Sequence, residues 1–213
     1  MSKTKITLAI AASYFIFAIL LNSVGTVILQ AINTLGVSKT EASVLEGFKD
    51  LSIAIMSFIV ASFIPRLGYK LAMLLALIVV AIACFCTAVI SEFYMFKLLF
   101  AAVGCGFAVV KVSVYSIIGQ VTEDANSHSS LLNTIEGIFM VGVLSGYWVF
   151  TAFIDPVDSN AWLNVYYVLA ALTLLVIISV VIAPIKPAIK GQKSNSGWND
   201  FIAMLKLTYQ PLV

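Results

Sequence analysis

Long apolar runs separated by short polar breaks dominate the chain. Six such runs can be delimited, at residues 6–30, 42–64, 71–90, 93–121, 131–154 and 162–185. At 1.5 Å per helical residue, each run is long enough to cross roughly 30 Å of hydrocarbon. None shows the alternation of apolar and polar residues that marks the strands of a membrane barrel. The pattern therefore predicts six transmembrane helices and an all-α membrane protein.

Composition excludes an ordinary soluble domain. Of 213 residues, 62% are hydrophobic and 10% are charged, whereas soluble domains hold about 45–50% apolar and about 25% charged residues. The 12 Lys/Arg and 10 Asp/Glu form no basic block, so we expect no nucleic-acid partner. Cys84, Cys86 and Cys105 lie inside apolar runs and are interpreted as packing residues, not as a disulfide pair or a metal site. We expect no cofactor.

The basic residues predict the orientation in the membrane. The first run follows Lys3 and Lys5, as a signal peptide would, but it is about twice as long as a secretory apolar core and lacks a cleavage site. We therefore expect it to be a retained span. With the N-terminus in the cytoplasm, the inner side collects Lys3, Lys5, Arg66, Lys70, Lys186, Lys190 and Lys193. The outer side keeps only Lys39 and Lys97, which predicts a multi-pass protein of the cytoplasmic (inner) membrane.

Three segments are expected along the chain. Residues 1–185 would form the transmembrane bundle. Residues 186–200, which read KPAIKGQKSNSGWND, are basic and contain Gly and Ser, as is typical of a linker, here in the cytoplasm. Residues 201–213 are apolar again but too short to cross. We interpret them as the start of a truncated seventh helix, so that a C-terminal six-helix half would be the missing partner.

The first span carries a polar stripe. Asn22, Thr26, Gln30 and Asn33 fall within an arc of about 80° on an ideal helix. Such residues either form hydrogen bonds between helices or line a cavity. Four of them on one face favour the cavity.

The second span contains Glu46, Lys49 and Asp50. The two acids share a helix face and resist being ionised together unless a cation lies near. Lys49 either supplies that cation or extends outwards to the interface. Glu46, about 12 Å from the helix start, is either interfacial or intramembrane, whereas Asp50 lies about 18 Å in.

Lys111 in the fourth span lies close to mid-membrane, about 18 Å from the inner boundary. A charge at that depth costs at least about 2.5–3.5 kcal/mol, so it needs water or a partner. By depth, Asp50 is the expected partner, in a pair that is either functional or purely structural. Gly104, Ala108 and Tyr115 are on the same face and are small or polar, consistent with a lumen.

The fifth span holds Asn133 and Glu136, followed by Gly142 and Gly146. Glu136 lies about 10 Å from the inner surface and is either an acid near the start of the helix or a group that water reaches from the cytoplasm. The two glycines form a G-x-x-x-G step that predicts a closely packed partner helix.

Charge is confined to the second, fourth and fifth spans, and the third and sixth carry none. This segregation separates cavity-lining helices from lipid-facing ones. A short similarity, LEGF at 45–48 and IEGI at 135–138, relates spans that enter from opposite sides, as an inverted 3+3 repeat requires.

The connection between the second and third spans reads ASFIPRLGYK. It is similar to the signature G-x-x-x-D-R-x-G-R-K of the major facilitator superfamily, with Arg66, Gly68 and Lys70 on matching positions. Pro65 replaces the acid and Ala61 the first glycine. The resemblance implies the N-terminal six-helix half of a twelve-helix fold, in which Arg66, Gly68 and Lys70 belong to a gating loop.

The stretch SLLNTIEG at 130–137 resembles the fucose:proton symporter branch of this superfamily. The acid of that branch in the first span is absent, and Asn22 and Ser23 stand near its place. The resemblance implies alternating access between two halves around a mid-membrane site, with the first and fourth spans lining the cavity and the third and sixth facing lipid.

Together these features predict a secondary active transporter, proton-coupled, for a small polar solute such as a sugar. The expected solute-binding residues are Asn22, Thr26, Gln30, Tyr115 and Asn133. The expected proton-coupling residues are Asp50, Glu46, Glu136 and Lys111. The alternative is a transporter or antiporter of organic anions, for which Lys111 is suited, or of amphipathic compounds.

Other classes find less support. The motif G-P-x-x-G-G of drug antiporters is missing, because Tyr147 follows Gly146. An intramembrane protease would need a serine motif and a membrane histidine, but Ser145 sits in GVLSG and His128 in a loop. No phosphate-binding loop is present. We expect no enzyme; a channel or a non-transporting receptor is left as an alternative that a solute-gradient uptake assay would test.

Overall fold

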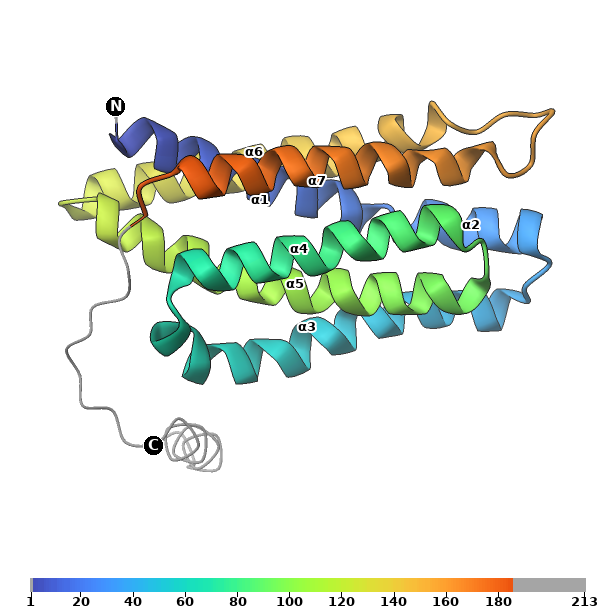
Figure 1. Cartoon of the computed structure of the whole chain (residues 1–213), viewed down its shortest axis with the longest axis horizontal. Coiled ribbons are helices and arrows are strands. Elements are labelled where there is room, and N and C mark those ends of the chain that lie inside the picture. Colours follow the sequence, from blue (N-terminus) through green and yellow to red (C-terminus); the bar gives the residue numbers. More distant parts are fainter. Residues whose placement is uncertain (1, 186–213) are drawn as a thin grey trace.

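The computed structural model describes residues 2–185, the side chains of residues 2, 61, 62 and 65 excepted. Within this range the chain is helical with no strand (Figure 1). The elements are α1 (Ser2–Asn22), α2 (Val24–Leu35), α3 (Lys39–Leu67), α4 (Tyr69–Val89), α5 (Phe93–Val121), α6 (Ala125–Thr151), a 3₁₀ turn η1 (Ala161–Asn164) and α7 (Val165–Ile182). The all-α prediction is confirmed. The predicted linker and seventh helix lie outside the described residues.

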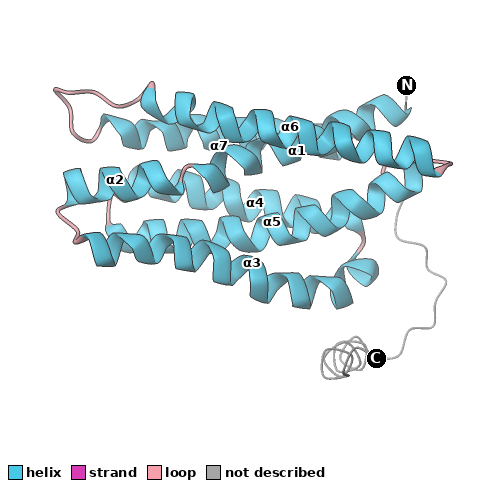
Figure 2. Ribbon diagram, turned by 180° about the vertical axis from the view of Figure 1, so that it is seen from behind, coloured by secondary structure: helices cyan, strands magenta, loops and turns pink. Residues whose placement is uncertain are grey.

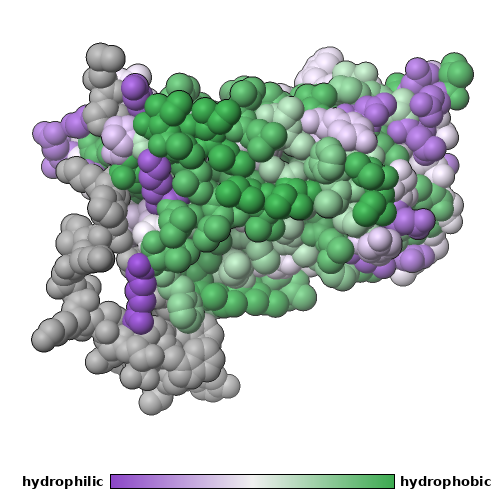
Figure 3. All heavy atoms as spheres, viewed as in Figure 1, coloured by the Kyte–Doolittle hydropathy of each residue, from purple (hydrophilic) through white to green (hydrophobic). Residues whose placement is uncertain are grey.

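The long helices lie side by side along one axis, and the chain reverses at the two ends of the bundle (Figures 1 and 2). Within the described residues, five segments are long and apolar enough to cross a membrane: Lys3–Leu35, Tyr69–Val89, Phe93–Val121, Ala125–Thr151 and Ala161–Ile182. The second predicted span, residues 42–64, corresponds to α3, a helix of 29 residues that is not among these five. Six crossings therefore stay a prediction. Apolar side chains cover the middle of the face in Figure 3, and polar ones gather towards its ends, as is typical of a membrane protein.

The first predicted span is interrupted at Ser23. Its hydroxyl donates to the Leu20 carbonyl oxygen at 2.7 Å. The backbone ladder still crosses the interruption, since the Ser23 N–H donates to Ile19 and the Val27 N–H to Ser23. A serine that bonds the preceding turn in this way bends a helix without ending it. The interruption between α1 and α2 is therefore a local break in one span.

Helix α6 begins at Ala125, earlier than the apolar pattern predicts, because Asp124 caps it. An Asp124 carboxylate oxygen accepts the Ser127 N–H at 2.8 Å, and the Ser127 hydroxyl oxygen accepts the Asp124 N–H at 3.4 Å. This reciprocal pair satisfies two backbone donors that would otherwise lack partners at a helix start. The polar residues before position 131 are therefore helical.

Each long helix of the bundle packs along at least one other helix. Helix α3 packs along α5, α1 along α6, and α4 along both α5 and α7, while α1 also contacts α7 and α5. In terms of the predicted spans, the second packs on the fourth, the first on the fifth, and the third on the sixth. At the end of the bundle near the α6–α7 connection, Phe96 stacks on Trp162 with ring centroids 5.4 Å apart.

Two of these pairs approach closely at glycines. A Cβ atom added to Gly142 on α6 would lie 2.7 Å from the Ala18 Cβ and 2.9 Å from the Phe15 carbonyl oxygen on α1, and one on Gly146 would lie 3.3 Å from the Ile19 carbonyl oxygen. The predicted close packing of the G-x-x-x-G step is confirmed, and its partner is α1. Glycines let helix backbones meet in this way, so dispersion and polar contacts between helices strengthen.

We expect Gly142→Ala to destabilise the bundle. The added methyl group has no room against Ala18, and overpacking of this kind costs about 1–3 kcal/mol. Thermal unfolding of the purified protein in detergent should show a melting temperature lower by several degrees.

Gly137→Ala on the same helix is the matched control. A Cβ atom there meets nothing within 4 Å, and alanine favours the helix by up to about 1 kcal/mol over glycine. The melting temperature should stay or rise. Equal melting temperatures for the two variants would contradict the packing described for α1 and α6.

Candidate functional site

Four aromatic side chains from three helices form a cluster at the middle of the bundle: Tyr14 on α1, Phe107 and Tyr115 on α5, and Phe139 on α6. The Tyr14 ring centroid lies 5.5 Å from Phe139, 6.1 Å from Phe107 and 6.5 Å from Tyr115. Phe107 and Phe139 stack at 5.6 Å. Tyr14 is buried and Tyr115 is 39% exposed, so this aromatic cluster extends from the core to the surface.

Lys111 lies on the surface side of the aromatic cluster. Its ammonium nitrogen is 5.8 Å from the Phe107 ring centroid and 5.8 Å from that of Tyr115, both within cation–π range. These rings are four residues before and after the lysine and share its helix face. Among the described residues Lys111 forms no ion pair. The positive charge is therefore bordered by aromatic faces.

Glu136 on α6 is the acid of this region. The Tyr115 hydroxyl donates to the Glu136 carboxylate at 2.7 Å, a short distance of the kind expected for a charge-assisted bond. The Tyr14 hydroxyl is buried and lies beside that of Tyr115. Lys111, the aromatic cluster and Glu136 together make up what we call the central site.

The expected pairing of Asp50 with Lys111 is wrong. Lys49 holds both acids of its own helix, with its ammonium 3.4 Å from Asp50 and 3.7 Å from Glu46. The alternative that Lys49 supplies the cation is confirmed. Its side chain is 12% exposed, whereas those of Glu46 and Asp50 are 59% and 62% exposed.

The helix register explains the error. Helices α3 and α5 run in the same direction (Figure 1), and a Cβ on Gly104 would contact Lys49, Ser52 and Ile53. Lys111 lies seven residues beyond Gly104, or about 10 Å at 1.5 Å per residue, and is therefore well below the level of Asp50. Gly104, Ala108 and Tyr115 were expected to line a lumen beside Lys111. Gly104 and Ala108 are buried, whereas Tyr115 is exposed, as Lys111 is.

The four residues of the polar stripe in the first span do not form one continuous solvent-exposed helix face. The Asn22 amide donates to the Val143 carbonyl oxygen on α6 at 2.8 Å, so for Asn22 the alternative of an interhelical hydrogen bond is confirmed. Gln30 is buried, Thr26 is half-buried and Asn33 is exposed. The break at Ser23 separates Asn22 from the other three. Asn133 on α6 is exposed.

The α3–α4 connection contains the residues of the expected gating loop. Gly68 has φ 92° and ψ 132°, a backbone conformation that favours glycine. Its neighbour Lys70 donates to the Val181 and Ala183 carbonyl oxygens at the C-terminal end of α7, both at 2.8 Å. Lysine there satisfies carbonyls that lack helical partners and complements the helix dipole. Arg66 lies in the last turn of α3.

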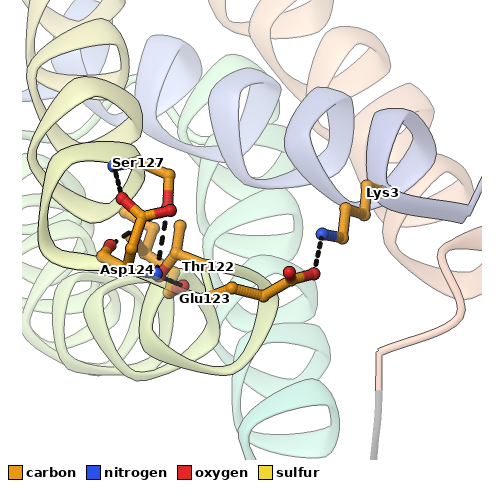
Figure 4. A network of polar contacts seen from close by, with 6 residues as sticks. Lys3, Thr122, Glu123, Asp124 and Ser127 are labelled. Carbon is orange, nitrogen blue, oxygen red and sulfur yellow. Dashed lines mark hydrogen bonds and ion pairs between the residues drawn. The ribbon is translucent and has the colours of Figure 1, made fainter.

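A polar network at the same end of the bundle was not predicted (Figure 4). Lys3 donates to Glu123 at 2.7 Å, which ties the start of α1 to the α5–α6 connection. This hydrogen bond and the lysine charge lower the pKa of Glu123. The Ser127 N–H likewise lowers the pKa of Asp124. Asp124 with Ser127 three residues later is a capping pattern that the sequence contains.

The described residues were compared with the ligand sets that metal ions need. Within residues 2–185, no group of three or more His, Cys, Asp or Glu side chains is placed to hold a metal ion. The only histidine, His128, has its Nδ1 atom 3.2 Å from the Thr122 hydroxyl near the start of α6.

Residues 9–210 match the family model described as Major Facilitator Superfamily. A search of curated proteins found no match.

We expect Lys70→Met to loosen the end of α7, since it removes both donors to Val181 and Ala183. Each kcal/mol lost is about a fivefold rise in local opening, so the Ala183 and Ile185 amides should exchange with deuterium several times faster. Lys5→Met, at the same end of the bundle and without an ion pair to a described residue, should leave that exchange unchanged. Identical exchange in both variants would contradict the contact.

Proposed function

This chain belongs to the Major Facilitator Superfamily, whose members are membrane transporters, and we propose that it is a proton-coupled secondary transporter of a small polar solute. The observation that carries the proposal is the contact between Tyr115 and Glu136 at 2.7 Å, beside Lys111, within helices made mainly of apolar residues. Ionisable groups inside a membrane bundle are costly and mark pathways for ions or solutes.

Glu136 is the group that we propose to bind the proton. As a carboxylate it accepts the Tyr115 hydrogen bond; once protonated it becomes a donor, and the α5–α6 contact must change its polarity. Protonation also removes the negative charge near Lys111. Because a ligand shifts a conformational equilibrium only through different affinities for the two states, this change of contact and charge is the proposed link to alternating access. Glu46 and Asp50, held by Lys49, are the secondary candidates.

The solute would meet the polar atoms that reach the surface around the central site. These belong to Tyr115 and to Asn133, which lies one turn before Glu136. Thr26 lies about 18 Å further along the first span than Tyr14 and would meet the solute away from this site. Asn22 and Gln30 would join them only after a rearrangement, because Asn22 bonds Val143 and Gln30 is buried. We place a sugar first among neutral solutes because Asn133 and Glu136 lie in the stretch that resembles the fucose:proton symporter branch.

The pairing of the helices supports the proposal that these spans form one half of a twelve-helix carrier. In an inverted 3+3 repeat, the contact of the second span with the fourth corresponds to that of the fifth with the first, and α3–α5 and α6–α1 are both extensive contacts. Leu45 and Ile135 of the two similar tetrapeptides are both fully buried. Gly47 and Gly137 both face open space.

The orientation that we propose places the N-terminus in the cytoplasm. Lys3, Arg66 and Lys70 lie at the end of the bundle that carries the N-terminus (Figure 1), and basic residues favour the cytoplasmic side. The contact of Lys70 with α7 would then belong to the cytoplasmic gate. The partner across the solute pathway would be a C-terminal six-helix half.

We expect Glu136→Gln to abolish proton coupling. The full protein is reconstituted into vesicles, and a panel of hexoses, polyols and hexuronates is added while the external pH is recorded. With wild-type protein, at least one solute should make the medium more alkaline as protons enter. Glu136→Gln should lose this signal but keep solute exchange down a gradient, because exchange needs no net proton movement.

Glu92→Gln is the matched control. Glu92 precedes α5, is exposed and makes no capping hydrogen bond through its side chain, so its loss should leave the pH signal intact. Proton entry that persists in Glu136→Gln would overturn the assignment of the proton site.

A further inference from the structure

We propose that the transported solute carries a carboxylate and that the Lys111 ammonium group binds it. This inference rests on the proposed transport function of the central site and names the chemical class of its solute. The carboxylate would take the place of the ion-pair partner that Lys111 lacks among the described residues.

The first argument is the environment of the charge. Lys111 lies near the middle of α5, and its neighbours on the same face are the rings of Phe107 and Tyr115, each 5.8 Å from the ammonium nitrogen. Cation–π attraction at such distances recovers only part of the cost of a charge at membrane depth. A charge retained there calls for an anion, which can come from the pathway.

The second argument is that the acids of the described helices are engaged elsewhere. Glu136 accepts the Tyr115 hydrogen bond. Glu46 and Asp50 hold Lys49, about 10 Å along the helix axis from the level of Lys111. Among the described residues no carboxylate forms an ion pair with the Lys111 ammonium group, which is therefore left for a solute.

The third argument concerns the kind of anion. A single ammonium group offers three donors to one point, which suits one carboxylate; a phosphate would need more donors than this face supplies. The proton of the Tyr115 hydroxyl is already directed at Glu136. The rings on both sides of Lys111 offer apolar faces to a carbon skeleton. A monovalent organic carboxylate fits these features best, and a sugar acid would also use Asn133.

This arrangement also couples solute and proton. A carboxylate on Lys111 brings one negative charge to the central site, and a proton on Glu136 removes one. The two ligands bound together therefore leave the net charge of the site unchanged, so each favours the other, by linkage to the same extent. Both ligands would then cross together.

The test compares matched pairs of probes on the full protein in lipid nanodiscs. Calorimetric titration measures binding of D-glucuronate against D-glucose, and of benzoate against benzyl alcohol. We expect the carboxylate of at least one pair to bind tenfold or more tightly than its neutral counterpart. Lys111→Gln should abolish that preference, and Lys111→Arg should retain part of it.

Lys97→Gln is the matched control, since Lys97 lies on the same helix with its ammonium 4.8 Å from the Phe93 ring centroid; it should keep the preference. Equal or tighter binding of the neutral members, a preference that survives Lys111→Gln, or no binding of either carboxylate would overturn the inference. The comparison within wild-type protein decides the matter even where Lys111→Gln does not fold.

Failure of this inference and failure of the proposed function are distinguishable. Proton entry driven by neutral sugars, without carboxylate binding, would leave the transport function standing and remove the carboxylate. Carboxylate binding that depends on Lys111, without any solute-driven proton entry, would support the binding site and remove proton coupling.

Discussion

The close approach of helices at glycine residues sets how α5 lies on α3 and how α6 lies on α1. Between apolar helices in lipid, little hydrophobic driving force favours association, so contact depends on how near the backbones come. Gly104 brings α5 against α3, and Gly142 and Gly146 bring α6 against α1. These contacts set the register of the helix pairs. The register of α5 on α3 keeps Asp50 away from Lys111.

The two lysines inside the bundle illustrate two solutions to one electrostatic problem. Lys49 is nearly buried and is compensated by two acids of its own helix, both of which are exposed. Lys111 is exposed on its face and is bordered by aromatic rings. The first arrangement is complete within the described helices. The Lys111 ammonium group can still accept an anion from outside these helices. For this reason the functional proposals rest on the central site and not on Lys49 with its two acids.

The helices of the fold could be predicted from the sequence more completely than the contacts within the site. Long apolar runs give helices because lipid leaves backbone groups no other partners, and the run 93–121 coincides with α5. The early start of α6 was missed because its first turn is polar and depends on the Asp124 cap. The break at Ser23 depends on a side-chain bond to Leu20, which hydropathy does not reveal.

Within the site, Lys111, Tyr115 and Glu136 were identified because ionisable and hydroxyl groups stand out in apolar helices. Their pairing was not predictable. The sequence gives the depth of a residue only relative to the ends of its own helix. How far one helix is shifted along its neighbour is decided when the two helices pack, so depth alone could not show which residues of α3 and α5 meet. The bond between Tyr115 and Glu136 joins two helices through such a shift, and no spacing within either helix indicates it.

The contact of Lys70 with α7 has a mechanical consequence. One side chain, rooted in the first turn of α4, fastens that turn to the terminal carbonyls of α7. These two helices also pack along each other. We therefore expect α4 and α7 to move together as one rigid unit. Bending inside the bundle is then left to other points, of which the break between α1 and α2 at Ser23 is one.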